Sequence, residues 1–156
     1  MKPYILDASA LVKAYHEEPG HDFVRGLIDS HQHCSVLSVS LAEVFYVLAK
    51  LCYDRKEILP DELAQYNAEI ARDIADERVK VRGTGGDLAL EILRLEIARK
   101  AWCLPNMKRD DRPNAVDCLV AAFASESEQT GAAVVSADGN LNTLLRDMGL
   151  SVEEPC

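Results

Sequence analysis

The pattern of hydrophobic and polar positions predicts strands and helices that alternate along almost the whole chain. Short apolar or alternating runs predict strands at residues 3–6, 34–38, 79–82, 133–136 and 150–152. Apolar positions spaced three and four residues apart predict helices at about residues 8–15, 21–30, 40–52, 60–75, 88–99, 114–130 and 141–148. This alternation indicates an α/β fold, with a mostly parallel sheet that helices cover on both faces.

Several residues predict where helices begin and end. Ser40 has the position of an N-cap, Pro60 that of a first helical residue, and Gly149 that of a C-terminal cap. The helix after Ser40 is expected to bury one apolar stripe, formed by Leu41, Val44, Phe45, Leu48 and Cys52.

Length and composition fit one globular domain that spans residues 1–156. Hydrophobic residues make up 48% of the chain, which suits a buried core and argues against disorder. No apolar run approaches the roughly 20 residues needed to cross a bilayer. Because Asp7 interrupts the N-terminal apolar run where a signal peptide would continue, we expect a cytoplasmic protein without a membrane segment.

Cysteine and histidine form no recognisable metal pattern. The five cysteines are odd in number, and no two have CxxC spacing, so we expect free thiols rather than disulfides or a zinc site. The four histidines fall in the N-terminal quarter of the chain, away from the acids that matter below, and we expect them on the surface. These residues are Cys34, Cys52, Cys103, Cys118, Cys156, His16, His21, His31 and His33.

The charge of the chain is strongly acidic. Twenty-six acids against 17 bases give a net charge of −9, which argues against broad electrostatic attraction to nucleic acid. One stretch, residues 99–112, has five bases and two acids. Within it, Lys108, Arg109 and Arg112 are candidates for contacts with RNA phosphates. The alternative is a solvated helix end followed by a loop.

Four acids are expected to meet at one edge of the sheet. Ligands of such sheets bind beyond the carboxyl ends of the strands. Asp7 ends the first strand, and Asp138 follows the strand at residues 133–136. Glu43 and Asp117 lie in the first turns of helices that begin at that same edge. The sequence therefore predicts four carboxylates, far apart along the chain, on one rim.

Carboxylates gathered in this way repel one another, and a hard divalent cation bound among them offsets this repulsion. Mg²⁺ and Mn²⁺ prefer oxygen ligands, and they activate water and stabilise charge on a phosphodiester. Structural explanations stay open for single acids. Residues 40–43 and 114–117 both have the spacing of a capping box, and Asp138 before Gly139 fits a turn.

Four segments resemble the motifs of PIN-domain proteins. Residues 4–12 resemble the first motif, an apolar strand followed by Asp, one residue, and Ser or Thr. Residues 40–44 resemble the second motif, a Glu early in a helix, and residues 116–124 the third. Residues 134–138 resemble the fourth, a hydroxyl residue, one position, and Asp. Order and spacing match, although residues 140–141 and the middle of the chain, residues 53–111, depart from the family pattern.

The resemblance implies a three-layer α/β/α sandwich and a metal-dependent endoribonuclease that acts on RNA with Mg²⁺ or Mn²⁺. Metal ligands or water-positioning acids would be Asp7, Glu43, Asp117 and Asp138, with Ser9 and Ser136 supporting them through their hydroxyls. Many members are VapC-type toxins of bacterial toxin–antitoxin pairs, so the resemblance also implies a homodimer silenced by a small antitoxin protein.

Two other functions remain open from the sequence. The excess of acid fits a non-catalytic PIN-like protein-interaction module, which would neither hold metal nor cleave RNA. A phosphotransfer domain of the receiver or haloacid-dehalogenase type also places an Asp after its first strand. The dehalogenases require a second Asp two residues later, where this chain has Ser9. The acidic pair and the later Lys that receivers require cannot be placed in the sequence.

Overall fold

A single parallel sheet organises the chain, seen in a computed structural model. The described residues are 2–30, 32–83, 97, 100–101, 103–105, 107–108, 111–127 and 131–156. The strands run in the order β3-β2-β1-β4-β5, and every pair of neighbours is parallel. Their bounds are β1 Pro3–Leu6, β2 His33–Leu37, β3 Val79–Arg82, β4 Ala133–Val135 and β5 Ser151–Glu153.

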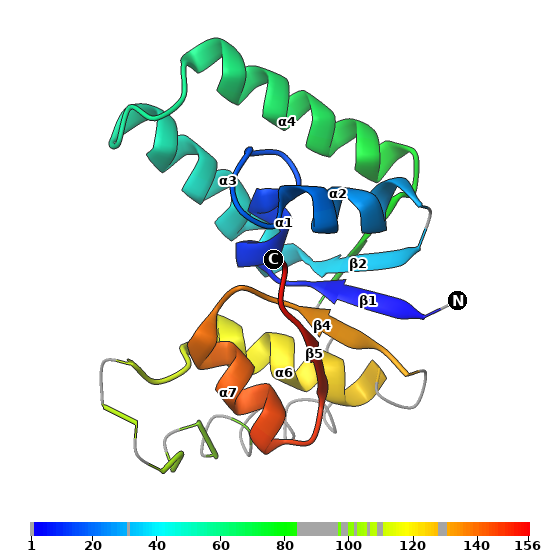
Figure 1. Cartoon of the computed structure of the whole chain (residues 1–156), viewed down its shortest axis with the longest axis vertical. Coiled ribbons are helices and arrows are strands. Elements are labelled where there is room, and N and C mark those ends of the chain that lie inside the picture. Colours follow the sequence, from blue (N-terminus) through cyan, green and yellow to red (C-terminus); the bar gives the residue numbers. More distant parts are fainter. Residues whose placement is uncertain are drawn as a thin grey trace.

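Helices cover both faces of this sheet (Figure 1), which confirms the expected α/β fold. Helices α1 to α4 lie on one side, and α6 and α7 lie on the other. The predicted helix at residues 88–99 lies almost entirely outside the described residues. The helices are α1 Ala8–Lys13, α2 His21–Asp29, α3 Ser38–Tyr53, α4 Pro60–Ala75, α6 Ala115–Ser127 and α7 Gly139–Asp147.

Successive residues of the central strands feed two separate cores. Leu6 and Val135 are buried in the core shared with α1 to α4, whereas Ile5 and Val134 are buried in the core shared with α6 and α7. Side chains of a strand alternate between the two faces of its sheet, and both faces are covered here. For this reason the strands read as continuous apolar runs instead of alternating patterns.

The strand order places a topological switch next to β1. After β1 the chain adds β2 and β3 on one side, and it later adds β4 and β5 on the other. Connections that leave β1 and β4 in opposite directions open a crevice at the carboxyl ends of these strands. Asp7 immediately follows β1, and Asp138 lies three residues after the end of β4.

Two predictions about α3 are wrong. The helix begins at Ser38 and has no side-chain cap, whereas Ser40 was expected to cap it. Ser40 is instead fully buried inside the first turns, so its burial in the core outweighs its preference for a cap. Phe45 was expected in the buried stripe, but 38% of it is exposed, while Val44 and Leu48 are buried. The stripe on α3 is therefore narrower than the apolar spacing predicts.

All five cysteines are free thiols, as expected. Cys34, Cys52 and Cys118 are buried, and the other two are exposed. Among the described residues, no helix combines the length and the apolar character that a membrane span requires.

Candidate active site

A cavity of about 440 Å³ opens at the carboxyl edge of the sheet, where the switch point predicts a ligand site. Its lining includes all four acids expected there. They come from the end of β1, from α3, from the start of α6 and from the turn after β4. The four acids, called the pocket acids below, are Asp7, Glu43, Asp117 and Asp138.

Asp7 is held at the junction of β1 and α1. Its backbone N–H donates to the Val135 carbonyl at 3.0 Å, which fixes the end of β1 against β4. Its side chain caps α1, with Oδ2 accepting from the Ser9 backbone N–H at 3.2 Å and from Ser9 Oγ at 2.8 Å. The cap and the burial of Asp7 together fix the carboxylate in one orientation.

Asp138 has the matching position on β4 and α7. Its Oδ1 caps α7 by accepting from the N–H groups of Asn140 at 2.8 Å and Leu141 at 3.1 Å. Its own backbone N–H donates to Ser136 Oγ at 3.0 Å. Every hydrogen bond that the described residues donate to this carboxylate goes to Oδ1, so Oδ2 stays available to the pocket.

The two expected serines connect these two junctions. Ser9 Oγ and Ser136 Oγ lie 3.4 Å apart, and Ser9 Oγ also accepts from the Ala137 N–H at 3.0 Å. A third residue that the sequence reasoning missed, Asn142, donates from Nδ2 to the Ser136 carbonyl at 3.1 Å. Its signal was available, since Asn142 lies one helical turn after Asp138.

Asp117 has a structural role as well as a place in the pocket. Asn114 Oδ1 accepts from the Asp117 N–H at 3.0 Å, and Asp117 Oδ2 accepts from the Asn114 N–H at 2.7 Å. This reciprocal pair is the capping box expected at the start of α6, with an Asp in the place of the usual Glu. The cap occupies Oδ2 of a buried carboxylate, and none of the described residues donates a hydrogen bond to Oδ1.

Glu43 lacks the structural role that its sequence allowed. A capping box with Ser40 would need the Ser40 hydroxyl as an acceptor at the helix start, but α3 begins two residues earlier. The Ser40 Oγ is buried without a hydrogen-bond partner among the described residues. Glu43 is half-buried in the second turn and lines the cavity. Helix capping therefore does not explain why a glutamate occupies position 43.

Burial disfavours the charged form of three pocket acids, Asp7, Glu43 and Asp117. Burial raises the pKa of Asp117 to about 7, with further contributions from Asp138, Asp7 and Glu43. Burial is also the main reason why the pKa values of Asp7 and Glu43 are raised, and the Asp138 charge adds to both. None of the pocket acids forms an ion pair with Lys or Arg in the described part of the chain.

The donor set fits a hydrated divalent cation. Within the described ranges, no three His, Cys, Asp or Glu residues stand close enough to hold a metal ion by themselves. Mg²⁺ does not need such a cage, because it keeps several of its waters and binds proteins through one or two carboxylates. A cation in the pocket would also stabilise the charged carboxylates, which burial and mutual repulsion disfavour. The pocket acids therefore offer a cation both oxygen ligands and negative charge that no other described residue neutralises.

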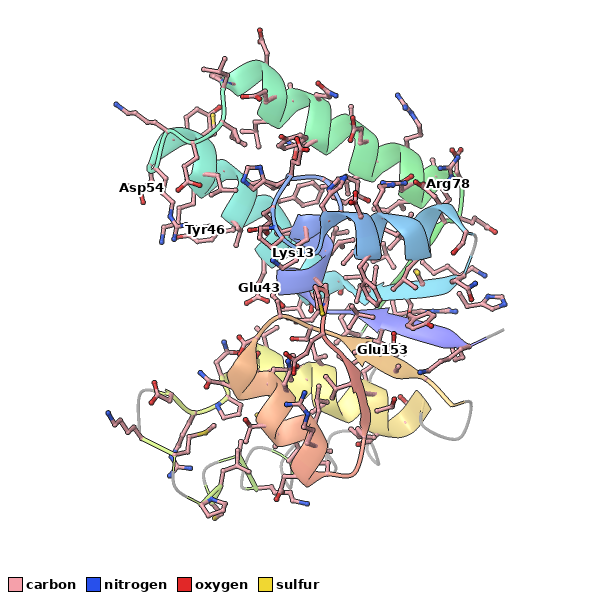
Figure 2. All side chains as sticks on the ribbon, in the orientation of Figure 1. Lys13, Glu43, Tyr46, Asp54, Arg78 and Glu153 are labelled. Atoms are coloured by element: carbon pink, nitrogen blue, oxygen red, sulfur yellow. The ribbon has the colours of Figure 1, made fainter. Side chains whose placement is uncertain are left out.

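Other residues that line the cavity were missed from the sequence, notably Lys13 and Tyr46 (Figure 2). Lys13 lies one helical turn after Ser9, and Tyr46 lies three residues after Glu43, so helical spacing places each beside a predicted residue. The Lys13 ammonium is already engaged, since Nζ donates to the Pro19 carbonyl at 2.9 Å and lies 3.6 Å from Glu18 Oε1.

The predicted RNA contacts are only partly described. Lys108 is exposed, and Arg109 lies outside the described residues. Arg112 is half-buried, and its guanidinium donates to the carbonyls of residues 101, 104 and 107 at 3.1 to 3.2 Å. These bonds stabilise the segment before α6, and the RNA-binding role of the three bases stays a prediction.

The expectation that all four histidines lie on the surface is wrong for two of them. His16 is half-buried with a buried Nδ1, and His21 Nδ1 lies 2.7 Å from the Lys13 carbonyl oxygen. His33 is exposed, and His31 lies outside the described residues.

Comparison of this chain with solved structures shows the same fold in three VapC-containing systems. The DNA-bound VapBC of Salmonella typhimurium is 18% identical with a TM-score of 0.63, and the match covers 100% of both chains. The DNA-bound VapBC2 of Rickettsia felis is 18% identical with a TM-score of 0.61, covering 97% of each chain. The sarcin–ricin-loop-cleaving toxin VapC20 of Mycobacterium tuberculosis is 17% identical with a TM-score of 0.58, covering 94% of this chain and 95% of the toxin.

Sequence comparison leads to the same family. No curated protein sequence matches the chain significantly. The profile of the PIN domain, however, matches residues 4–144, a range that includes all four pocket acids and both serines. This match leaves the phosphotransfer interpretation without support. The chain belongs to the PIN-domain family.

Proposed function

We propose that this PIN-domain protein is an endoribonuclease that hydrolyses RNA phosphodiester bonds with Mg²⁺ or Mn²⁺. One observation carries the proposal: the four pocket acids come from distant segments and line one cavity, and none has a cationic partner among the described residues. PIN-domain proteins are typically nucleases with a divalent metal, which supports the same conclusion.

The pocket acids would hold the cation, which supplies a water activated for attack and charge stabilisation on the phosphodiester. The protein holds two of these carboxylates in fixed orientations. Ser9 fixes Asp7 Oδ2, and the N-terminus of α7 fixes Asp138 Oδ1. In the metal-free pocket burial raises the pKa of Asp117 to about 7, and a bound cation would favour its carboxylate form. Glu43 keeps the freedom to approach the cation or a water, because none of the described residues donates a hydrogen bond to it.

We further propose that the protein is the toxin of a bacterial type II toxin–antitoxin pair. The support is the likeness of fold to VapC proteins from three organisms over nearly the full length of each chain. A small antitoxin protein would then bind and silence it, and the toxin would act as a homodimer in the cytoplasm. A neighbouring reading frame for a short DNA-binding protein, whose product co-purifies with this chain, is the expected finding.

The nuclease proposal is tested with purified full-length protein and a labelled structured RNA. Cleavage is expected with Mg²⁺ or Mn²⁺ and none with a chelator. The Asp7→Asn variant keeps an acceptor for the α1 cap but loses the charge. It should lose more than the roughly 100-fold that changes around metal ligands typically cost. Asp54→Asn, an exposed acid at the far end of α3, is the matched control and should cleave normally. Equal cleavage by both variants would contradict the proposal.

The alternative is a non-catalytic PIN-like interaction module. It is favoured by the finding that no three acids among the described residues stand close enough to hold a metal ion without added waters. It predicts no cleavage under any cation, no saturable Mn²⁺ binding, and tight binding to a partner protein instead.

A further inference from the structure

Lys13 is the one cation among the described residues that line the acidic cavity. It lies at the C-terminal end of α1, and its side chain is only 14% exposed. Glu18 lines the same cavity, so the described part of the lining contains five acids and one base. An ammonium in such surroundings is attracted to every nearby carboxylate. The pocket acids would be its expected partners.

Lys13 nevertheless forms no ion pair with any of the pocket acids. Its Nζ donates to the Pro19 carbonyl oxygen at 2.9 Å and lies 3.6 Å from Glu18 Oε1. Both of these acceptors belong to the loop between α1 and α2. The loop therefore holds the ammonium at its own side of the cavity, rather than against the pocket acids.

The loop that holds the ammonium is itself fixed. His21 Nδ1 lies 2.7 Å from the Lys13 carbonyl oxygen, which joins the start of α2 to the end of α1. Gly20 has a φ of +97°, and a Cβ on it would lie 2.8 Å from the Pro155 carbonyl oxygen. The C-terminal segment thus packs directly on the turn after Pro19. These contacts keep the Pro19 carbonyl, and with it the Lys13 ammonium, in place.

The ammonium keeps donors for a ligand. It has three N–H groups, and the described residues accept one of them at hydrogen-bond distance. Glu18, at 3.6 Å, adds attraction without a hydrogen bond. Phosphate oxygens suit the remaining donors, because lysine binds phosphate as a compact point charge on a flexible stem. A cavity of about 440 Å³ is small enough to bring a bound phosphate and Lys13 together.

The charge of the cavity favours such a contact. The chain has a net charge of −9, and a phosphate that enters the cavity is repelled wherever no cation contacts its oxygens. A divalent cation at the pocket acids would contact one part of the phosphate. Lys13 supplies positive charge to the rest of it, from the loop side of the cavity.

We propose that Lys13 binds the phosphate that is cleaved and stabilises the negative charge on its non-bridging oxygens during cleavage. This inference rests on the proposed ribonuclease function and adds a catalytic residue to it. In the reaction, the water oxygen bonds to phosphorus, the bond to the leaving sugar oxygen breaks, and one water proton ends on that oxygen. Lys13 keeps its proton throughout, and the Pro19 carbonyl and Glu18 position it.

Three substitutions separate this role from bracing of the loop. Lys13→Met removes the charge and all donors, whereas Lys13→Gln removes the charge but keeps a donor for the Pro19 carbonyl. Lys13→Arg keeps the charge. Lys50→Met is the matched control, since Lys50 is an exposed lysine on α3 that does not line the cavity.

The variants are compared in three assays. Cleavage of a labelled RNA with Mg²⁺ gives kcat and KM. Fluorescence anisotropy in the Asp7→Asn background gives RNA affinity at several salt concentrations without cleavage. Calorimetric titration with Mn²⁺ gives metal affinity with Asp7 intact. Urea unfolding shows that each variant is folded.

We expect kcat to fall about 100-fold in Lys13→Met and Lys13→Gln, the usual loss when one group that stabilises developing charge is removed. Lys13→Arg should retain most of the activity. RNA affinity should fall about 10-fold without the charge, as for one charge-assisted hydrogen bond. The slope of log affinity against log salt should become shallower by about 0.7 to 0.9, the value for one phosphate contact.

Metal affinity provides the readout that is independent of RNA. Removal of a nearby positive charge cannot weaken the binding of a cation, so Mn²⁺ affinity should not fall in Lys13→Met or Lys13→Gln. A fall would show that Lys13 shapes the metal site instead of contacting the substrate, and it would overturn the inference. Lys50→Met should match the parent in every assay.

Equal kcat values for Lys13→Gln and Lys50→Met would overturn the inference and leave the ribonuclease proposal standing. An equal loss in Lys13→Arg, or an unaltered salt slope, would also overturn it, because bracing of the loop would then explain the lysine. Absence of cleavage by the unaltered protein, with RNA binding that still depends on the Lys13 charge, would uphold the phosphate contact and count against the ribonuclease proposal.

Discussion

Two regions of the molecule bury carboxylates in opposite ways. Asp73 on α4 is 4% exposed, and it accepts from Tyr15 Oη at 3.0 Å and from Arg25 Nη1 at 2.8 Å. Arg78 adds a second cation 3.9 Å away. Arg25 also forms hydrogen bonds with Asp29. The carboxylates of Asp29 and Asp73 raise the pKa of the Arg25 guanidinium, and Asp29 contributes more. In the cavity, by contrast, Asp7, Asp117 and Asp138 have backbone or hydroxyl donors, and no pocket acid has a cationic partner among the described residues.

The difference separates a structural site from a functional one. A buried charge is costly unless it is paired, and the Asp73 cluster meets this requirement with residues of its own chain. It joins α2, α4 and the turn after α1 on the side of the molecule away from the cavity, where Arg78 appears in Figure 2. The pocket acids leave the requirement unmet. Asp7 and Asp117 in particular are buried, lack a cationic partner among the described residues and have raised pKa values, which points to a ligand that brings positive charge.

The largest expected effect comes from breaking the paired region. Arg25→Ala leaves Asp73 buried with only Tyr15 and the more distant Arg78. The free energy of unfolding should fall by about 3 kcal/mol, the lower end for a broken buried ion pair, since Arg25 is partly exposed. Urea unfolding measures this loss. Arg55→Ala removes an exposed pair with Glu57 and should change stability little. A loss in Arg25→Ala no larger than in this control would remove the distinction between the two regions.

Asp117 provides a sharper comparison through pH. Burial raises its pKa from the ordinary 3.8 to about 7, so between these pH values the folded state holds a proton that the unfolded state has lost. The stability of the metal-free protein should therefore fall as pH rises from about 4 to about 7. The full pKa difference corresponds to about 4 kcal/mol, and we expect on the order of 2 kcal/mol because water in the open cavity screens part of the cost.

Asp117→Asn keeps an acceptor for the Asn114 N–H and removes the titrating group. Unfolding in urea at pH 5 and at pH 8, with a chelator present, should show a smaller pH dependence in this variant. The variant should also be the more stable protein at pH 8. Parallel pH profiles for the two proteins would show that the burial of Asp117 imposes no such cost.

The smallest expected effect concerns the hydroxyl between the two junctions. Ser9→Ala removes the 2.8 Å bond to Asp7 and the acceptor for the Ala137 N–H. Metal affinity and cleavage should each fall about tenfold, the low end for residues that orient metal ligands, because the backbone bond to Asp7 remains. Ser125→Ala on α6 serves as the control, since this serine does not line the cavity. Unaltered metal affinity in Ser9→Ala would limit Ser9 to capping α1.

Much of the fold was predictable because local signals and burial agree. The bounds of β1 and β3 match the prediction, and α4 runs from Pro60 to Ala75 as expected, since proline fixes its start. The start of α3 was not predictable from local rules. A buried serine inside a helix looks like a cap when the core around it is unknown, as Ser40 shows.

The candidate site was predictable for the residues that end strands or start helices. Topology alone places Asp7, Glu43, Asp117 and Asp138 at one edge. It does not reveal residues whose importance lies in loop contacts or in distant pairing. Lys13 resembles any helical lysine until its bond to the Pro19 carbonyl is known, and the partner of Asp73 lies 48 residues away on α2.

The central claim is that the pocket acids bind a divalent cation, because no Lys or Arg among the described residues neutralises their charge. Calorimetric titration with Mn²⁺ near pH 6.5 tests it most directly. The account predicts saturable binding with release of protons, since Asp117 is partly protonated there. Binding should be lost in an Asp7→Asn, Asp138→Asn double variant and retained in Asp54→Asn. No saturable binding by the unaltered protein, or equal binding by the double variant, would contradict the claim.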